Sequence, residues 1–491
     1  MIKLYFFFFI FLVSTLGFSQ NITAKLIDKN TKNPIPFASI KTGDYSGVIT
    51  NEEGYFSISD ENQESTILNI SCLGYKSKSL TIKDLKTLNF IVALDEAFNQ
   101  LNEIYISNRK PNADSIIARV KRKFSENYNV SLKTYNIFYR ATDYIDFENL
   151  DFEIDKASHV KKQQLERANS DLDGLSRDII NSKTIHFTDF KANFYTQDKE
   201  NSKLVITKAT KLIDQKNDFS LNQVEKRAQH IVLKYLDTTK TYKVKSGLFK
   251  VEDSMSLKNE AIKNKQKNEL QLNDLKNSTN NLLYKSQLRE NSFLSSILNS
   301  NLYQYSLAAI AYYNDEITYI ISYKPKKGKA KYTGKLYVND ENYAISKLDY
   351  TFFEDRYGSK LNLKLLLGVK YIENLKRGLI IYQKNEDNIY QPKYIKQETG
   401  SYFYVNRDLT LIENSKNRNK VSSNFKIEGN GRQKVEILFT SSSTNTQEEF
   451  NSIKQEKTAP YQILNKFDKG IWNNEETLEP LEEMKRFNIK K

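Results

Sequence analysis

The side chains best suited to metal or acid–base chemistry are few in this chain of 491 residues. Three histidines are present: His159, His186 and His230. A zinc hydrolase needs two histidines and an acid on the metal, together with a glutamate as general base. None of the three histidines stands in an HxxE or HExxH spacing. We therefore predict no catalytic residue, no metal ligand and no cofactor, and we interpret the histidines as surface or partly buried residues.

Two further features are candidates for chemistry, and both have simpler interpretations. Cys72 is the single cysteine, so no intramolecular disulfide can form. It follows the alternating run 68–71, which favours an inert thiol in a core. The Gly-Asn-Gly run at 429–431 is not followed by a helical pattern, so we interpret it as a loop turn rather than a phosphate-binding loop.

The composition favours β-sheets and a buried core. The chain has 31 Tyr and 28 Phe, residues that suit a sheet with one wet face. Lys and Arg number 74 against 60 Asp and Glu, a formal net charge of +14. The lysines are dispersed among acids, and the sequence has no arginine-rich or RNP-like element, so we expect no nucleic-acid partner.

Residues 1–19 have the three-part layout of a secretory signal peptide. Lys3 gives a positive start, an apolar run follows from Leu4 to Val13, and small polar residues lead to cleavage before Gln20. The apolar run is shorter than the ~20 residues of a membrane-spanning helix, and no later stretch is long enough to cross as a helix. We therefore expect export to the periplasm or the outer-membrane periphery, without a transmembrane segment after cleavage.

Short strands with turn signals between them follow the signal segment. They read ITAKLID (22–28), PIPFASI (34–40), SGVITNEEGYFSI (46–58), LNISCLGY (68–75) and FIVAL (90–94). This spacing is typical of an antiparallel sandwich.

In their order, these segments resemble the carboxypeptidase-regulatory-like domain over residues 20–107. That family is a transthyretin-like, seven-stranded sandwich common in exported proteins of the Bacteroidetes. The resemblance implies an accessory module, which lies beside the catalytic domain in metallocarboxypeptidases and before the plug in TonB-dependent receptors. It carries no catalytic residue that could be transferred to this chain.

Helical patterns connect the sandwich to the remainder of the chain. Within residues 108–130, Ile116, Ile117, Val120 and Phe124 recur at helical spacing and predict a connecting amphipathic helix. Residues 156–182 carry apolar residues at a looser helical spacing, and a Lys/Asn-rich segment lies at about 255–300. Because the leucines of this segment keep no strict heptad, we favour surface helices or a mobile insertion over a coiled-coil arm.

The C-terminal third changes to strands. EITYIISY (316–323) and YTGKLYV (332–338) precede the polar turn 339–342, and YAISKLDYTFF follows at 343–353. Further strands are predicted at 361–371, 379–383, 393–405 and 435–440. Short polar turns predict an antiparallel meander with one wet face and one dry face, the latter covered by the predicted helices.

The run YTGKLYVNDENYAISKLDYTF is similar in order and shape to the curved sheet of the periplasmic lipoprotein carriers LolA and LolB. That resemblance implies a helix-capped sheet that can hold acyl chains in an apolar cavity, and no ligand-binding residue transfers from it. An ordinary filled core is the alternative.

Taken together, the sequence predicts a mainly β, α+β protein. The sandwich leads through the helix to an α+β domain at 131–450, and 451–491 form a charged tail. We predict a non-enzymatic exported cell-envelope protein with a binding or assembly role, whose partner is an envelope protein. One alternative is a periplasmic carrier of a lipid or other hydrophobic ligand; the other, a hydrolase, has no catalytic constellation behind it.

Overall fold

The computed structural model describes residues 21–43, 45–59, 63–97, 111–128, 132–158, 160–182, 184–198, 201–214, 219–234, 236–237, 239–247, 249–256, 268–289, 291–313 and 316–488. The predicted signal peptide, His159 and part of the predicted insertion lie outside these residues. Within the described part of the chain, no helix is both long and apolar enough to cross a membrane.

The N-terminal domain is the predicted seven-stranded sandwich, with a short helix α2 (Ile82–Thr87) at one end. Its two sheets have the orders β4-β1-β7 and β3-β2-β5-β6. The strands are β1 (Ile22–Asp28), β2 (Ser39–Lys41), β3 (Gly47–Ile49), β4 (Tyr55–Ile58), β5 (Ile67–Ser71), β6 (Lys78–Thr81) and β7 (Ile91–Leu94). One pairing departs from the antiparallel prediction. Strand β7 runs parallel to β1, and the chain reaches β7 through α2 from β6 of the other sheet.

Fourteen strands of the described residues form one large sheet, which confirms the predicted curved antiparallel meander. Its main path runs β14-β15-β16-β17-β19-β20-β21-β8-β9-β10-β23, and β11, β12 and β18 pair beside it. These strands are β8 (Lys133–Ala157), β9 (Thr184–Thr196), β10 (Ser202–Leu212), β11 (Thr241–Ser246), β12 (Phe249–Ser256), β14 (Tyr303–Tyr313), β15 (Glu316–Pro325), β16 (Tyr332–Asn339), β17 (Ile345–Phe352), β18 (Lys360–Leu363), β19 (Val369–Lys384), β20 (Tyr390–Glu413), β21 (Lys420–Thr444) and β23 (Gln462–Leu464).

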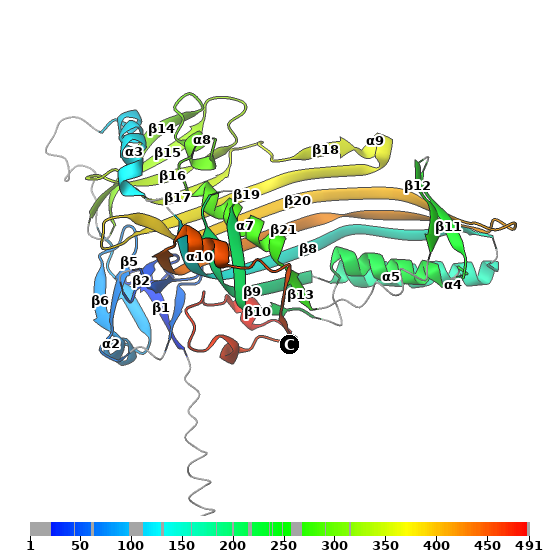
Figure 1. Ribbon diagram of the computed structural model, residues 1–491, viewed down its shortest axis with the longest axis horizontal. Coiled ribbons are helices and arrows are strands. Elements are labelled where there is room, and N and C mark those ends of the chain that lie inside the picture. Colours follow the sequence, from blue (N-terminus) through cyan, green and yellow to red (C-terminus); the bar gives the residue numbers. More distant parts are fainter. Residues whose placement is uncertain are drawn as a thin grey trace, which may run out of the picture.

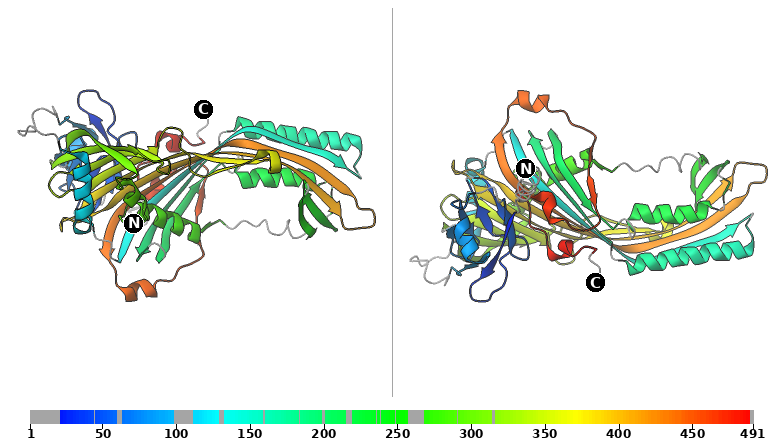
Figure 2. Two further views of the ribbon diagram at one scale, coloured as in Figure 1. Left: turned by 90° about the horizontal axis from the view of Figure 1, so that it is seen from above. Right: turned by 90° about the horizontal axis from the view of Figure 1, so that it is seen from below.

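Three strands of this sheet are unusually long and give the molecule its length. Strands β8, β20 and β21 have 25, 24 and 25 residues and run from the body that carries the sandwich to a distal lobe (Figure 1). Helices α4 (Lys162–Asn181) and α5 (Leu221–Leu233) lie along the distal part of these strands (Figure 2). Apolar side chains from both helices form one distal core with those of the strands.

Two details of the large sheet differ from the sequence prediction. The Gly-Asn-Gly run at 429–431 lies inside β21 and is no loop turn. A Cβ on Gly429 would lie 2.4 Å from the backbone oxygen of Asp146, so glycine allows the neighbouring strand to approach. The strand predicted at 361–371 is broken by the short helix α9 (Lys364–Leu367), which ends at Gly368 with a φ of +62°.

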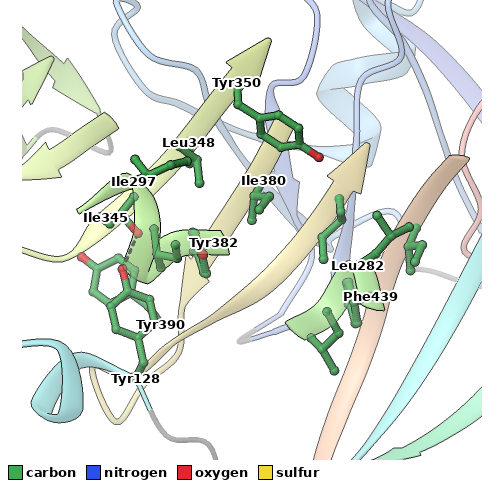
Figure 3. Close-up of a cluster of buried hydrophobic side chains, with 14 of the residues drawn as sticks. Tyr128, Leu282, Ile297, Ile345, Leu348, Tyr350, Ile380, Tyr382, Tyr390 and Phe439 are labelled. Atoms are coloured by element: carbon green, nitrogen blue, oxygen red, sulfur yellow. Dashed lines mark hydrogen bonds between the residues drawn. The ribbon is translucent and has the colours of Figure 1, made fainter. Parts of the chain in front are cut away.

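The body core lies between the sheet and the helices predicted to cover it. These are α3 (Ala113–Asn127), α7 (Leu272–Lys285) and α8 (Phe293–Ile297). Figure 3 shows Leu282 of α7, Ile297 of α8 and Tyr128, the residue after α3, among the apolar side chains of the sheet. Tyr128 donates a 2.6 Å hydrogen bond to the backbone oxygen of Ile345. Ile297, Leu348 and Ile380 are 0% exposed. A void large enough for water would leave accessible area on the side chains that line it, so these three side chains line no such void.

The sequence predicts a charged tail at 451–491, and the described part of this segment, residues 451–488, contacts both domains. Strand β22 (Thr458–Pro460) pairs with β13 (Glu269–Gln271), and β23 pairs in parallel with β10. A 3-10 helix (Lys469–Trp472) and helix α11 (Glu482–Lys485) follow, after α10 (Gln447–Ser452) earlier in the chain.

Candidate functional site: the cleft between the sandwich and the large sheet

The histidines are not brought together in the described part of the chain. His186 on β9 is buried and lines a groove of about 700 Å³ with Arg227 of α5 and Asp214. His230 is exposed on α5. Among the described residues, no group of three or more His, Cys, Asp or Glu is placed to hold a metal ion.

The sandwich and the large sheet share one hydrophobic core. Phe138 of β8, Tyr394 of β20 and Leu438 of β21 belong to the same buried cluster as the sandwich side chains. Trp472 joins this cluster from the C-terminal segment, with its ring perpendicular to that of Phe138 at 5.3 Å between centroids. Burying large aromatic side chains between two domains holds the domains in a fixed arrangement.

Polar contacts reinforce the same boundary. The Nζ atom of Lys393 donates to the backbone oxygens of Tyr45 at 2.9 Å and Phe439 at 2.8 Å, and the Tyr45 hydroxyl donates to the backbone oxygen of Pro392. Lys396 of β20 pairs with Glu52 of the sandwich at 2.7 Å. The two domains are therefore joined by hydrogen bonds as well as by apolar packing.

A polar cleft of about 380 Å³ lies along this boundary. Both domains line it, mostly with hydroxyl, amide and amine side chains: Ser39, Lys41, Asn69, Ile70, Ser71, Ser77, Lys78 and Ser79 from the sandwich, and Tyr313, Glu316, Ile381, Tyr382, Gln383, Lys384 and Lys393 from the sheet. The cleft therefore has four lysines against one carboxylate.

The charges of the cleft are not mutually neutralised. Lys384 pairs with Glu316 at 2.7 Å, which accounts for the one carboxylate. Lys41 and Lys78, on the sandwich wall, pair with no carboxylate among the described residues, and the Lys78 Nζ donates to the backbone oxygen of Ala93 at 3.3 Å. The Oγ atom of Ser77 is buried and has no hydrogen-bond partner among the described residues. Such a wall favours a ligand that is anionic and accepts hydrogen bonds.

Lys393 is the most unusual side chain of the cleft. It is 1% exposed, and burial lowers the pKa of its amine to about 7, against a smaller opposing effect of Glu476. Burial also raises the pKa of Glu476. A lysine amine with a pKa near neutrality has the proton affinity that general-base catalysis needs. Here, however, two backbone oxygens hold the amine, which makes Lys393 a hydrogen-bond donor that joins the domains.

Sequence reasoning did not single out this site, and the physical reason is clear. The sequence predicts a strand at 393–405 with one wet face, whereas all residues from Tyr390 to Ile395 are buried. The sandwich covers the face of the sheet that the alternation predicts to be wet. The alternation of polar and apolar residues within one strand does not indicate that another domain covers its polar face.

Residues 22–106 match the family model of the CarboxypepD_reg-like domain. The sandwich is a CarboxypepD_reg-like domain. The match ends before the large sheet begins. No curated protein matches the chain.

Two solved structures show remote likeness to the chain. A putative outer membrane lipoprotein-sorting protein domain from Vibrio parahaemolyticus has 7% identity and a TM-score of 0.21, over 69% of this chain and 97% of that one. The outer membrane protein OprG from Pseudomonas aeruginosa has 8% identity and a TM-score of 0.13, over 64% and 99%. TM-scores this low do not support a conclusion about the fold or function of the chain.

Proposed function

We propose that this protein is a non-enzymatic cell-envelope protein that binds an acidic segment of a partner protein in the cleft described above. The observation that carries the proposal is the composition of the cleft, with Lys41 and Lys78 facing it among hydroxyl and amide groups. Carboxylates of a partner would pair with these amines, while its backbone oxygens accept hydrogen bonds from the serines. Because the sequence predicts an export signal, we expect this interaction to take place in the periplasm or at the outer-membrane periphery.

The fixed arrangement of the two domains supports this proposal. Lys393, Trp472 and Tyr394 hold the CarboxypepD_reg-like domain against the sheet. The cleft therefore needs little reordering when a ligand enters, and less conformational entropy is lost on binding. A volume of about 380 Å³ accommodates a few side chains of an extended segment.

The carrier alternative needs an apolar space beneath the covering helices. Ile345, Leu348 and Ile380, which lie where such a space would have to open, are each 0% exposed. An acyl chain could enter only if the helices moved away from the sheet. The filled packing at these residues therefore favours the protein-binding role.

Fluorescence anisotropy with a labelled hexaglutamate peptide tests the proposal. We expect the full chain to bind hexaglutamate and not hexalysine. The double variant Lys41→Glu/Lys78→Glu should weaken binding by about tenfold or more, since each pairing lost is one charge-assisted contact. Lys83→Glu, an exposed lysine on α2, is the matched control and should bind like the wild type. Equal weakening by the control, or absence of hexaglutamate binding, would contradict the proposal.

A photo-crosslinking amino acid at Ser79 extends the test to the natural partner. Ser79 is exposed at the edge of the cleft, and Thr87 is exposed on α2. We expect one discrete crosslinked product in intact cells from position 79 and none from position 87. The same product from both positions would show that the contact does not involve the cleft.

A further inference from the structure

The hairpin of β18 and β19 carries exposed leucines where its two strands meet. Leu365 is 101% exposed and Leu366 is 81% exposed on α9, and Leu361 is 46% exposed on β18. Figure 1 shows α9 in the distal half of the molecule, away from the sandwich and beside β20, which continues past it. A single exposed leucine is ordinary, but a contiguous group of exposed leucines on one element marks an interaction surface. We call residues 360–371 the leucine hairpin.

The strand register gives the leucine hairpin two chemically different faces. Leu361 pairs with Tyr371 and Leu363 pairs with Val369, and directly paired residues point to the same side of a sheet. These four side chains therefore make one apolar face. Tyr371 is in turn paired with Phe403, which packs against the distal core, so this apolar face continues into the lobe.

The opposite face is basic. Asn362 pairs with Lys370, and Lys360 pairs with Ile372 on that side. The ammonium of Lys370 lies 5.1 Å from the ring centroid of Tyr402, and that of Lys364 lies 4.1 Å from the ring centroid of Tyr404. Contacts with aromatic rings hold these cations at defined positions just behind the leucines.

The conformation of the leucine hairpin is fixed by the neighbouring strand. Gly368 donates its N–H to the backbone oxygen of Lys364 at 3.1 Å and accepts a 2.7 Å hydrogen bond from the N–H of Asn406. A Cβ at position 368 would lie 2.0 Å from the backbone oxygen of Asn406. Only glycine fits there, because the φ is positive and the strand is close. The sheet therefore presents the leucines in one arrangement.

We propose that the leucine hairpin inserts its apolar turn into the surface of an anionic lipid bilayer. Exposed leucines on a turn can enter the boundary between headgroups and acyl chains, and Lys360, Lys364 and Lys370 then lie at the level of the anionic headgroups. Three lysines within eleven residues accompany the leucines, and their positive charge complements anionic headgroups. This favours an anionic bilayer over an apolar groove of another protein as the binding surface. This surface lies in the distal half of the molecule, away from the cleft, and stands independently of the function proposed above.

Co-sedimentation of the full chain with vesicles tests the proposal. We expect binding to vesicles of equal phosphatidylcholine and phosphatidylglycerol, and binding weaker by about tenfold or more to pure phosphatidylcholine. The variant Leu365→Asp/Leu366→Asp should lose binding to the anionic vesicles by about tenfold or more. Ile67→Asp/Ile91→Asp is the matched control, because these sandwich residues are 55% and 50% exposed. It should bind like the wild type.

A fluorescence measurement separates insertion from simple adhesion. In Leu366→Trp the new indole should show a blue-shifted emission when anionic vesicles are added, as it leaves water. Absence of that shift, unchanged binding of the aspartate variant, or equal binding to neutral vesicles would overturn the proposal. A leucine-dependent dimer in analytical ultracentrifugation, without vesicle binding, would assign the surface to a second copy of the chain and overturn it as well.

Discussion

Arg140 of β8 and Asp189 of β9 face each other in direct register and form a buried ion pair with two contacts. The Nε–Oδ1 distance is 2.9 Å and the Nη2–Oδ2 distance is 2.7 Å, and the side chains are 6% and 1% exposed. The remaining Nη1 donates to the backbone oxygen of Leu478 at 3.1 Å. This pair therefore connects two strands of the sheet with the C-terminal segment that reaches the sandwich.

Removing one partner of this pair should be strongly destabilising. Asp189→Ala leaves the buried guanidinium of Arg140 without its counter-charge, and we expect a loss of roughly 3–5 kcal/mol in the free energy of unfolding. Urea denaturation of the purified protein measures this loss. The double variant Arg140→Met/Asp189→Leu should recover most of it, since no unpaired charge remains. A single variant within about 1 kcal/mol of the wild type would contradict this account.

Stability should rise with pH because of Lys393. Burial lowers the pKa of Lys393 to about 7 in the folded protein, whereas an unfolded lysine titrates near 10.4. Between these values the unfolded chain binds a proton that the folded chain does not, so stability increases by up to about 1.4 kcal/mol per pH unit. Below pH 7 both states are protonated and the slope disappears.

Denaturation midpoints at pH 6, 7 and 8 check this expectation. Lys393→Met should flatten the increase between pH 7 and 8, because methionine keeps the apolar stem without an amine. Lys327→Met, at an exposed lysine, should retain the wild-type slope. The measurements end at pH 8 because burial lowers the pKa of Lys285 to about 8. Above that pH, Lys285 also contributes to the increase of stability with pH. An identical slope in Lys393→Met and wild type would exclude Lys393 as its source.

Trp472 should hold the CarboxypepD_reg-like domain in place. It is 7% exposed and packs against Phe138, and Lys208 lies 5.0 Å from the centroid of its ring. Trp472→Ala removes this packing and should destabilise the protein by about 3–5 kcal/mol. Limited proteolysis should also detach the N-terminal domain faster. Trp472→Phe should retain most of the packing, and equal proteolysis of the two variants would count against an anchoring role.

The thiol of Cys72 should react slowly in the folded protein. Burial raises its pKa to about 11, which leaves on the order of a hundredfold less thiolate at pH 8 than an ordinary cysteine. Titration with a chromogenic disulfide reagent should be slow for the native chain and fast in denaturant. Rapid labelling without denaturant would show that the thiol is accessible, contrary to its interpretation as inert.

Residue patterns within single segments were sufficient to predict most of the strands and helices. The turns at Gly54 and Asn339 predict strand ends that the structure has, and the apolar spacing from Ile116 to Phe124 predicts α3. The break at Gly368 was missed, because the leucines of 361–367 fit a strand as well as a helix and the positive φ depends on the close approach of Asn406.

The candidate site depends on contacts between distant segments and was therefore not predictable. Lys393 follows Pro392 in an ordinary strand sequence, and its burial comes from Tyr45 and Phe439, which are remote in the chain. The packing of the sandwich on the sheet determines which polar residues line the cleft. That packing produces no periodic pattern of residues in the sequence.

Strand β19 joins the cleft to the leucine hairpin in one uninterrupted segment. It is 16 residues long and, at about 3.3 Å per residue, spans roughly 50 Å from Val369 beside the hairpin to Lys384 in the cleft. If a partner and a bilayer were bound at the two ends of β19, the number of residues in the strand would set the distance between them. Inserting two residues would lengthen the strand by about 7 Å and keep each side chain on its present face of the sheet. Inserting one residue would move the side chains beyond the insertion to the opposite face.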